Sequence, residues 1–175
     1  MTFKPTWTLL AAAALAPVAC RGPVLPAAGP METSRFESPV WGAKLAYPAD
    51  WTPRPGRGME PVVLELRAPG STETAGTGVT LVAFYSAASL DDTVRAYARR
   101  LPARTFSSRL TCGGYPAAAF DYATRVDGKL VRTRSVLIRA PERFFVLTFA
   151  AYEPQYEFAR PSFSLIEKSL EIAGD

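Results

Sequence analysis

The position of the first cysteine suggests covalent chemistry. Cys20 follows a positive charge at Lys4 and an apolar stretch from Trp7 to Ala19. A basic start, a short apolar core and a small residue before cysteine are typical of a bacterial export signal that is cleaved before that cysteine, whose thiol then carries lipid. We therefore expect residues 1–19 to be a lipoprotein signal peptide and Cys20 to be the lipidated residue.

Two other interpretations of this segment stay open. Pro17 occupies a position where lipoprotein signals usually carry leucine, so an ordinary export signal is the rival interpretation. Its best cleavage site, Ala14-Leu15-Ala16, would release a soluble exported protein with proline at its N-terminus, which the general signal peptidase tolerates poorly. A buried core helix with an incidental cysteine is the third interpretation. The stretch is too short to span a bilayer comfortably, since spanning takes about 20 apolar residues.

The second cysteine, Cys112, has no partner for an internal disulfide if Cys20 is lipidated. It stands beside Gly113-Gly114, and a small buried residue is the interpretation we favour. A reactive thiol would need exposure and a cationic neighbour such as Arg109.

The chain contains no histidine. This excludes Ser-His-Asp and Cys-His catalysis and nearly every zinc or copper site. The sequence also lacks a nucleophile elbow, a glycine-rich phosphate loop and an aspartate-rich calcium loop. Its 16 acidic residues leave catalysis by a pair of carboxylates possible, but no two of them stand out by spacing. We therefore predict a protein that is not an enzyme and holds no cofactor or metal.

Charge and composition divide the rest of the chain. The net charge is +4, and the arginines are scattered among acidic residues, so we expect no nucleic-acid partner. Residues 20–35 are rich in Pro, Ala and Gly and show no hydrophobic period, which is typical of a flexible spacer. We expect a lipid-anchored spacer there, followed over residues 36–175 by one monomeric α+β domain with its own core.

Alternating apolar and polar residues predict three half-buried strands in the first half of this domain, over 40–47, 62–67 and 79–85. The intervening segments are rich in Pro, Gly, Ser and Thr, and we expect loops over 52–60 and 68–78, the second of them mobile.

A helix is predicted next. Ser89 and Asp92 have the spacing of a capping box, and the helix should stop at Pro102. Its apolar face repeats at helical spacing, through Leu90, Val94, Tyr97 and Leu101.

The second half of the domain is predicted to form antiparallel strands. Asp127-Gly128 between 117–126 and 129–139 predicts a hairpin, because this dipeptide supplies the positive φ angles of a type I′ turn. The implied register places Asp121 opposite Arg134, which we interpret as a pair that fixes register on a solvated face.

The most apolar segment, 144–151, is expected to be a central strand. We predict that a loop follows it and that Pro161 opens a final helix, with Phe163, Ile166 and Leu170 on one face.

The order of these elements and several short motifs resemble the PsbP-like family, which includes bacterial lipoproteins of the DcrB kind. The resemblance spans roughly residues 36–172. The matching residues are Tyr47, Pro48 and Trp51, then Ser89-Leu90, Gly114, Pro116-Ala117, Phe145-Val146-Leu147-Thr148, Pro161, Phe163, Ile166 and Ser169. The resemblance implies an α-β-α sandwich with a twisted, mainly antiparallel central sheet flanked by helices. It also implies a role in binding and stabilising partner proteins, and it brings no shared catalytic residues.

Three functions are consistent with these features of the sequence. We expect a non-enzymatic lipoprotein of the bacterial cell envelope that binds an unknown envelope protein, as an assembly or stability factor. Its expected binding residues are Arg54, Arg57, Tyr152, Tyr156 and Phe158. The alternative is a carrier of a small ligand or lipid, with an apolar cleft between sheet and helix. The third is an enzyme that uses carboxylates or Cys112.

Overall fold

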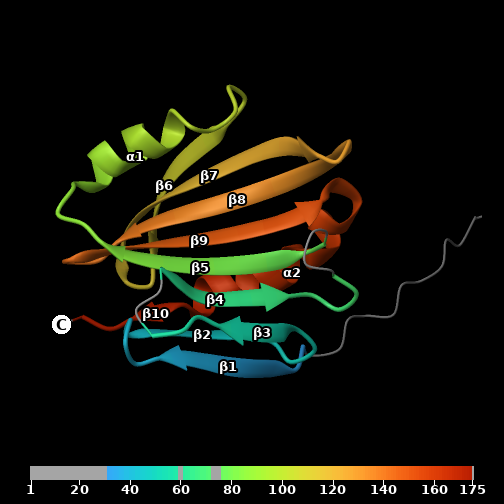
Figure 1. Ribbon diagram of the computed structural model, residues 1–175, viewed down its shortest axis with the longest axis horizontal. Helices are drawn as coiled ribbons and strands as arrows, with labels where there is room; N and C mark the ends of the chain where they lie inside the picture. The colour runs from blue at the N-terminus through green and yellow to red at the C-terminus, as the bar shows by residue number, and fades with distance from the viewer. Residues whose placement is uncertain (1–30, 59–60, 72–75, 175) are drawn as a thin grey trace, which may run out of the picture.

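The computed structural model describes residues 31–58, 61–71 and 76–174. The predicted signal peptide, Cys20, most of the predicted spacer and the centre of the predicted mobile loop lie outside these residues. The described chain forms ten strands and two helices (Figure 1). Their bounds are β1 (Thr33–Ser38), β2 (Ala43–Pro48), β3 (Thr52–Pro55), β4 (Val62–Arg67), β5 (Gly78–Tyr85), α1 (Leu90–Ala98), β6 (Phe106–Cys112), β7 (Tyr115–Val126), β8 (Lys129–Arg139), β9 (Arg143–Tyr152), α2 (Glu153–Ser169) and β10 (Glu171–Ile172).

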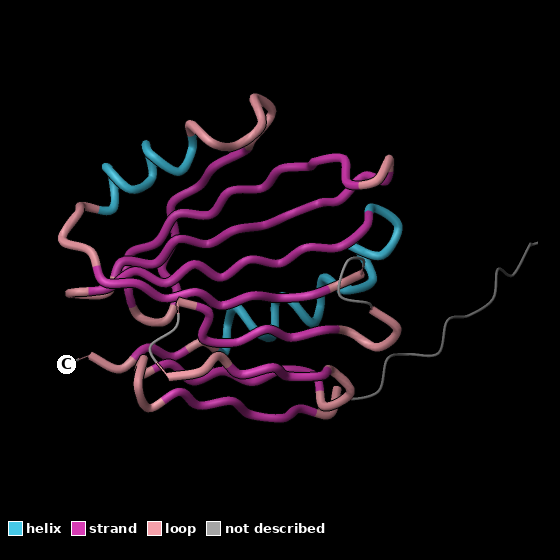
Figure 2. The backbone as a smooth tube through the Cα atoms, in the orientation of Figure 1, coloured by secondary structure: helices cyan, strands magenta, loops and turns pink. Residues whose placement is uncertain are grey.

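Two antiparallel sheets organise these elements (Figure 2). The larger sheet has seven strands in the order β3-β4-β5-β9-β8-β7-β6, and the smaller one has three in the order β1-β2-β10. The apolar strand β9 is therefore central, as predicted. The expected strands at 40–47, 62–67 and 79–85 correspond to β2, β4 and β5.

The β7–β8 hairpin confirms the prediction from its turn residues. Asp127 and Gly128 adopt φ angles of 49° and 76°, as a type I′ turn requires. The register pairs Phe120 with Ser135 and Asp121 with Arg134. Successive residues of each strand point to opposite faces, so this register decides which side chains meet which helix.

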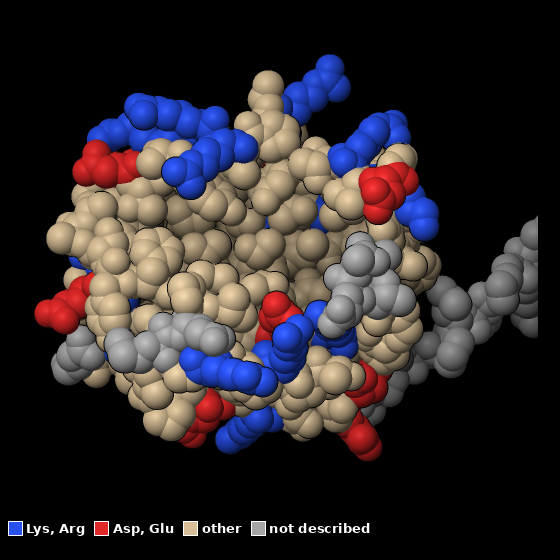
Figure 3. Space-filling model, viewed as in Figure 1, with Lys and Arg blue, Asp and Glu red and all other residues tan. Residues whose placement is uncertain are grey.

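Helix α1 covers part of one face of the large sheet. The Ser89 hydroxyl accepts a hydrogen bond from the Asp92 backbone N–H at 3.1 Å, which confirms the predicted cap. Tyr97 packs on Phe120 with ring centroids 5.3 Å apart. The helix ends at Ala98, before the expected stop at Pro102. The part of this face that α1 leaves open is largely uncharged, while lysines and arginines gather over α1 and at the margins (Figure 3).

Helix α2 covers the opposite face and corrects one prediction. It runs over Glu153–Ser169, so Tyr156 and Phe158 lie on a helix and Pro161 lies inside it. Pro154 occupies the first turn, where its missing N–H costs no helical hydrogen bond. The helix continues through Pro161 because the buried side chains of Phe163 and Ile166 hold the following turns on the core.

The small sheet is attached to the end of α2. The Ser169 hydroxyl accepts a hydrogen bond from the Ala46 N–H at 2.9 Å and lies 3.1 Å from the Ala46 carbonyl, to which it can donate. Tyr47 and Trp51 are buried nearby, which agrees with their interpretation as residues that cap the core. The large sheet thus lies between two helices, which confirms the predicted α-β-α sandwich.

Strand β1 begins at Thr33, so the last residues of the segment expected to be spacer, up to Arg35, belong to an edge strand of the small sheet. Both edge strands of the large sheet also differ from prediction. Residues 52–55, expected in a loop, form the exposed strand β3. Its Pro53 and Pro55 lack the backbone N–H that would donate a hydrogen bond to a neighbouring strand. Prolines are tolerated there because an edge strand needs only one row of hydrogen bonds. Strand β6, at the other edge, was not predicted because most of its side chains are exposed and it lacks a clear apolar alternation.

Candidate functional site

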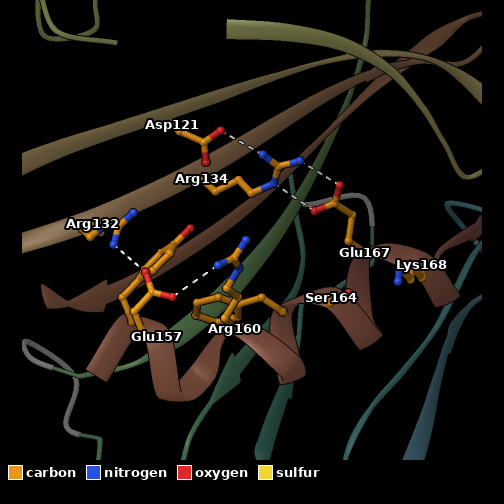
Figure 4. A pocket seen from close by; sticks show the side chains of 10 residues that line it. Asp121, Arg132, Arg134, Glu157, Arg160, Ser164, Glu167 and Lys168 are labelled. Atoms are coloured by element: carbon orange, nitrogen blue, oxygen red, sulfur yellow. Dashed lines mark hydrogen bonds and ion pairs between the residues drawn. The ribbon is translucent and has the colours of Figure 1, made fainter. Parts of the chain in front are cut away.

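A groove of about 490 Å³ lies between α2 and the strands β7 and β8 (Figure 4). We call it the charged groove, because most of its lining side chains are ionised. They are Asp121 from β7, Arg132 and Arg134 from β8, and Glu157, Arg160, Glu167 and Lys168 from α2. Strand register and helical periodicity together bring these residues to one place.

Arg134 links the sheet to the helix at one end of the groove. Its Nε and Nη2 donate to the two carboxylate oxygens of Glu167 at 3.0 Å each, and its Nη1 donates to Asp121 Oδ2 at 2.9 Å. The side chains of Arg134 and Glu167 are 26% and 19% exposed. Hydrogen bonds to Glu167, with the charges of Glu167 and Asp121, raise the pKa of Arg134, so the guanidinium stays charged.

The predicted pair of Asp121 and Arg134 therefore exists, but its surroundings differ from expectation. We expected it on a solvated face, whereas the structure places it under α2 with Glu167 as a third member. Glu167 is far from Asp121 and Arg134 in the sequence, and no local spacing in the chain predicts that it pairs with them. Its partnership follows from helix packing, which the hairpin register alone does not determine.

Arg132 forms a second cluster at the other end of the groove. It donates from Nη1 to Glu157 Oε1 at 2.7 Å, and its guanidinium carbon lies 4.5 Å from the centre of the Tyr156 ring. Arg160 Nη1 lies 3.4 Å from the other Glu157 oxygen. Burial raises the pKa of the Tyr156 hydroxyl, which favours its protonated form.

Lys168 lies apart from these clusters in Figure 4. Across residues 31–58, 61–71 and 76–174, no ion pair or hydrogen bond of its side chain is found. The groove lining carries four cations and three carboxylates. It can therefore offer cationic groups to a partner while most of its own charges stay paired.

A smaller hollow of about 170 Å³ extends the charged groove toward the sheet edge and shares Asp121, Arg132 and Tyr156 with it. Phe106 of β6 and Arg104 complete its rim. The Phe106 side chain is 79% exposed. Sequence reasoning did not single out Phe106, because an isolated aromatic at the start of an unpredicted strand gives no signal.

Cys112 is buried, as predicted. Its thiol lies 3.7 Å from the Glu167 carbonyl oxygen, to which it can donate. Burial, with a smaller contribution from the Glu167 charge, raises the pKa of Cys112 to about 12. Arg109, the cation that a reactive thiol would require, instead pairs with Asp91 of α1.

The residues predicted to bind a partner occupy different elements. Arg54 lies on the edge strand β3, within 3.7 Å of Glu65, and Arg57 lies in the following loop. Tyr152 ends β9, where Lys129 approaches its ring at 5.1 Å.

The other two predicted residues lie on different sides of α2. Tyr156 is buried beside the charged groove, under Arg132. Phe158 is 82% exposed and belongs to another hollow. Tyr156 is thus the predicted residue that lines the charged groove.

The described residues contain no group of three or more Cys, Asp or Glu side chains that could hold a metal ion. Neither helix in this part of the chain is long and apolar enough to cross a membrane.

Comparison of the chain with models of protein families found no match, and comparison with curated proteins also found none. Solved structures do match. Cyanobacterial PsbP (CyanoP) from Synechocystis is 12% identical with a TM-score of 0.55, over 90% of this chain and 100% of that one. The domain has a PsbP-like fold. LpqN of Mycobacterium tuberculosis, described as involved in cell envelope biogenesis, is 18% identical with a TM-score of 0.56, over 82% and 91% of the two chains.

A protein from Bacteroides thetaiotaomicron has a TM-score of 0.60 and 17% identity to this chain. The match covers 83% of this chain and 50% of that one, so the PsbP-like domain corresponds to half of the larger protein. At these identities the likeness concerns the fold, and the function has to be argued from the chain's own residues.

Proposed function

We propose that this protein is a lipoprotein of the bacterial cell envelope whose PsbP-like domain binds a partner protein through the charged groove, without catalysis. The observation that carries the proposal is the combination, in one open groove, of arginines and a lysine with the exposed aromatic ring of Phe106 at its extension. Arginine and aromatic residues are enriched at protein–protein interfaces and dominate their binding energy.

The ion pairs of the groove favour binding over proton transfer. Asp121, Glu157 and Glu167 each accept a hydrogen bond from an arginine. The buried thiol of Cys112, with its pKa raised to about 12, is protonated at neutral pH and is a poor nucleophile. These groups therefore give no support to an enzyme that uses carboxylates or Cys112.

The carrier of a small ligand or lipid is less well supported. The charged groove does lie between sheet and helix, where that function expected its cleft. However, ligand pockets for apolar molecules have predominantly hydrophobic walls, whereas this lining is mostly charged.

The envelope location rests on the sequence before the domain, which predicts export and lipidation at Cys20. A structural neighbour described as involved in cell envelope biogenesis is consistent with that location.

The proposal is tested by cross-linking the full-length protein in native membranes and identifying what it captures. The Phe106→Ser and Arg160→Glu variants alter the extension and the groove, whereas Arg99→Glu makes the same charge change at the end of α1. We expect one dominant partner that is captured by the wild type and by Arg99→Glu and is at least tenfold depleted with the two groove variants. Equal capture by all of these proteins would contradict a groove interface.

A Cys20→Ala variant tests the anchor separately. We expect the untethered protein to leave the membrane fraction, and a membrane partner to be captured less efficiently. Unchanged membrane association would show that Cys20 does not hold the protein there.

A further inference from the structure

Another hollow, of about 310 Å³, lies on a different side of α2, and none of its described lining residues is charged. We call it the neutral hollow. Trp51 contributes to it from the turn after β2, Pro69 and Ser71 come from the loop after β4, and Phe158, Ala159 and Ser162 come from α2. Its helical residues differ from those of the charged groove, so the two surfaces use different sides of the same helix.

Phe158 stands at the neutral hollow with 82% of its side chain exposed, although a phenylalanine is normally buried. Gln155 and Ala159 of α2 also line the hollow, so the exposed ring is surrounded by uncharged side chains. The exposed ring beside a hollow with uncharged described lining residues offers a surface on which apolar groups can pack.

The chain enters the described domain next to this surface. Met31, 44% exposed, lies with its sulfur 4.0 Å from the Ser162 hydroxyl, one helical turn from Phe158. In Figure 1, β1 begins at the end of the molecule where β9 ends and α2 begins. The entry point of the chain and the neutral hollow therefore lie on the same side of the domain.

Cys20 is eleven residue steps before Met31. Even a fully extended segment of that length reaches no more than roughly 40 Å. A lipid on Cys20 would keep Met31, and with it Phe158, at a high effective concentration near the bilayer. A contact too weak to form between a free protein and a membrane can form under that constraint.

We propose that the neutral hollow faces the bilayer and that the Phe158 ring inserts among the lipid headgroups. This inference rests on the proposed lipid anchor. The occupant is a lipid surface, because the tether brings that surface to this side of the domain, and apolar side chains favour the boundary between headgroups and acyl chains. The lining residues that the structure describes carry no charge, so we expect a contact that does not depend on anionic lipid. The charged groove, on a different side of α2, stays open to a partner.

The test uses the mature protein, purified from its host membranes, in vesicles of zwitterionic phosphatidylcholine with brominated acyl chains, which quench tryptophan fluorescence on contact. A Phe158→Trp variant reports on the neutral hollow, and Phe106→Trp is the matched control at a similarly exposed phenylalanine on β6. The wild type supplies the background from the buried Trp41 and Trp51. We expect the brominated lipid to reduce the fluorescence that Phe158→Trp adds to the wild type at least twofold, at low and at high salt alike. The fluorescence that Phe106→Trp adds should not be quenched.

Each other outcome overturns the inference, and the outcomes separate its failure from that of the anchor. If the protein floats with the vesicles but Phe158→Trp is not quenched, the face is wrong while the anchor stands. Equal quenching of both variants would mean that the domain has no preferred face. A protein that does not float with the vesicles lacks the anchor itself.

Discussion

Arg134 is the residue that joins the sheet to α2 by charge. It contacts carboxylates on both elements and is largely shielded from water, so its interactions are screened less than those of a surface pair. Arg160, also in the charged groove, has a side chain that is 73% exposed. The two arginines should therefore differ in their contribution to stability.

We predict that Arg134→Ala lowers the free energy of unfolding by about 1–2 kcal/mol, because Glu167 and Asp121 would lose their partner in a partly desolvated place. Arg160→Ala should change it by no more than about 0.5 kcal/mol. Chemical denaturation of both variants measures the difference. Equal effects would mean that the burial of the Arg134 network adds nothing to stability.

Because the pKa of the Cys112 thiol is raised, we predict that the protein loses stability at alkaline pH. Its pKa is about 12 in the folded protein and near 9.0 when solvated, so the folded state holds the proton more tightly. The stabilisation is complete below pH 9 and is lost as pH rises toward 12. In a Cys20→Ala background, we expect unfolding at pH 10 to need about 1 kcal/mol less than at pH 8 because of this group.

Cys112→Ala removes that contribution and is the control. Burial also raises the pKa values of Tyr97 and Tyr156, so these groups likewise lower the free energy of unfolding as pH rises. Both tyrosines are present in both proteins. The difference between the two pH dependences therefore belongs to Cys112. If the free energy of unfolding changed equally with pH in the two proteins, the raised pKa of the Cys112 thiol would be contradicted.

Among the elements, α2 carries an internal proline. Pro161 cannot donate the hydrogen bond that position 161 would give to the Glu157 carbonyl, whereas Pro154 lies in the first turn, where no such bond is made. We predict that Pro161→Ala raises the free energy of unfolding by about 1 kcal/mol, less than the full cost of an internal proline, since proline also restricts the unfolded chain.

Pro154→Ala should be close to neutral or slightly destabilising, because proline is well suited to a first helical turn. Thermal unfolding of the two variants provides the comparison. A loss of stability with Pro161→Ala would mean that the packing of Phe163 and Ile166 depends on the geometry that the proline imposes.

The same elements explain what the sequence could predict. The register of the β7–β8 hairpin was predicted to the residue, because Asp127-Gly128 determines the turn and the turn determines the register. The start of α2 was misplaced, because Pro154 and Pro161 are equally suited to a first turn and only the packing of the Tyr156 ring shows that the helix has already begun.

The charged groove was largely beyond prediction for a related reason. One of its ion pairs, between Asp121 and Arg134, follows from the hairpin register. Glu157 and Glu167 reach the groove through the packing of α2 on the sheet, which depends on contacts distant in sequence.

At the scale of the whole molecule, α2 separates two surfaces. The charged groove and the neutral hollow use different residues of the helix, so variants of one surface should leave the other unchanged. We predict that Arg160→Glu depletes the captured partner without altering lipid quenching in a Phe158→Trp background, and that Phe158→Ser leaves partner capture intact once the protein is anchored.

Capture of the partner and quenching by brominated lipid, measured on the same set of variants, check this independence. A variant of one surface that changes both readouts would show that the two surfaces act as a single interface. Arg99→Glu, at the C-cap of α1, is expected to change neither readout.

The burial of Cys112 also makes the mature protein suitable for site-specific labelling. If lipid occupies the Cys20 sulfur, the remaining thiol is protonated and enclosed by the core at neutral pH. A maleimide dye or spin label should then react at one newly introduced surface cysteine and leave the native one untouched. The orientation of the domain on a membrane could thus be mapped position by position without removing any native residue.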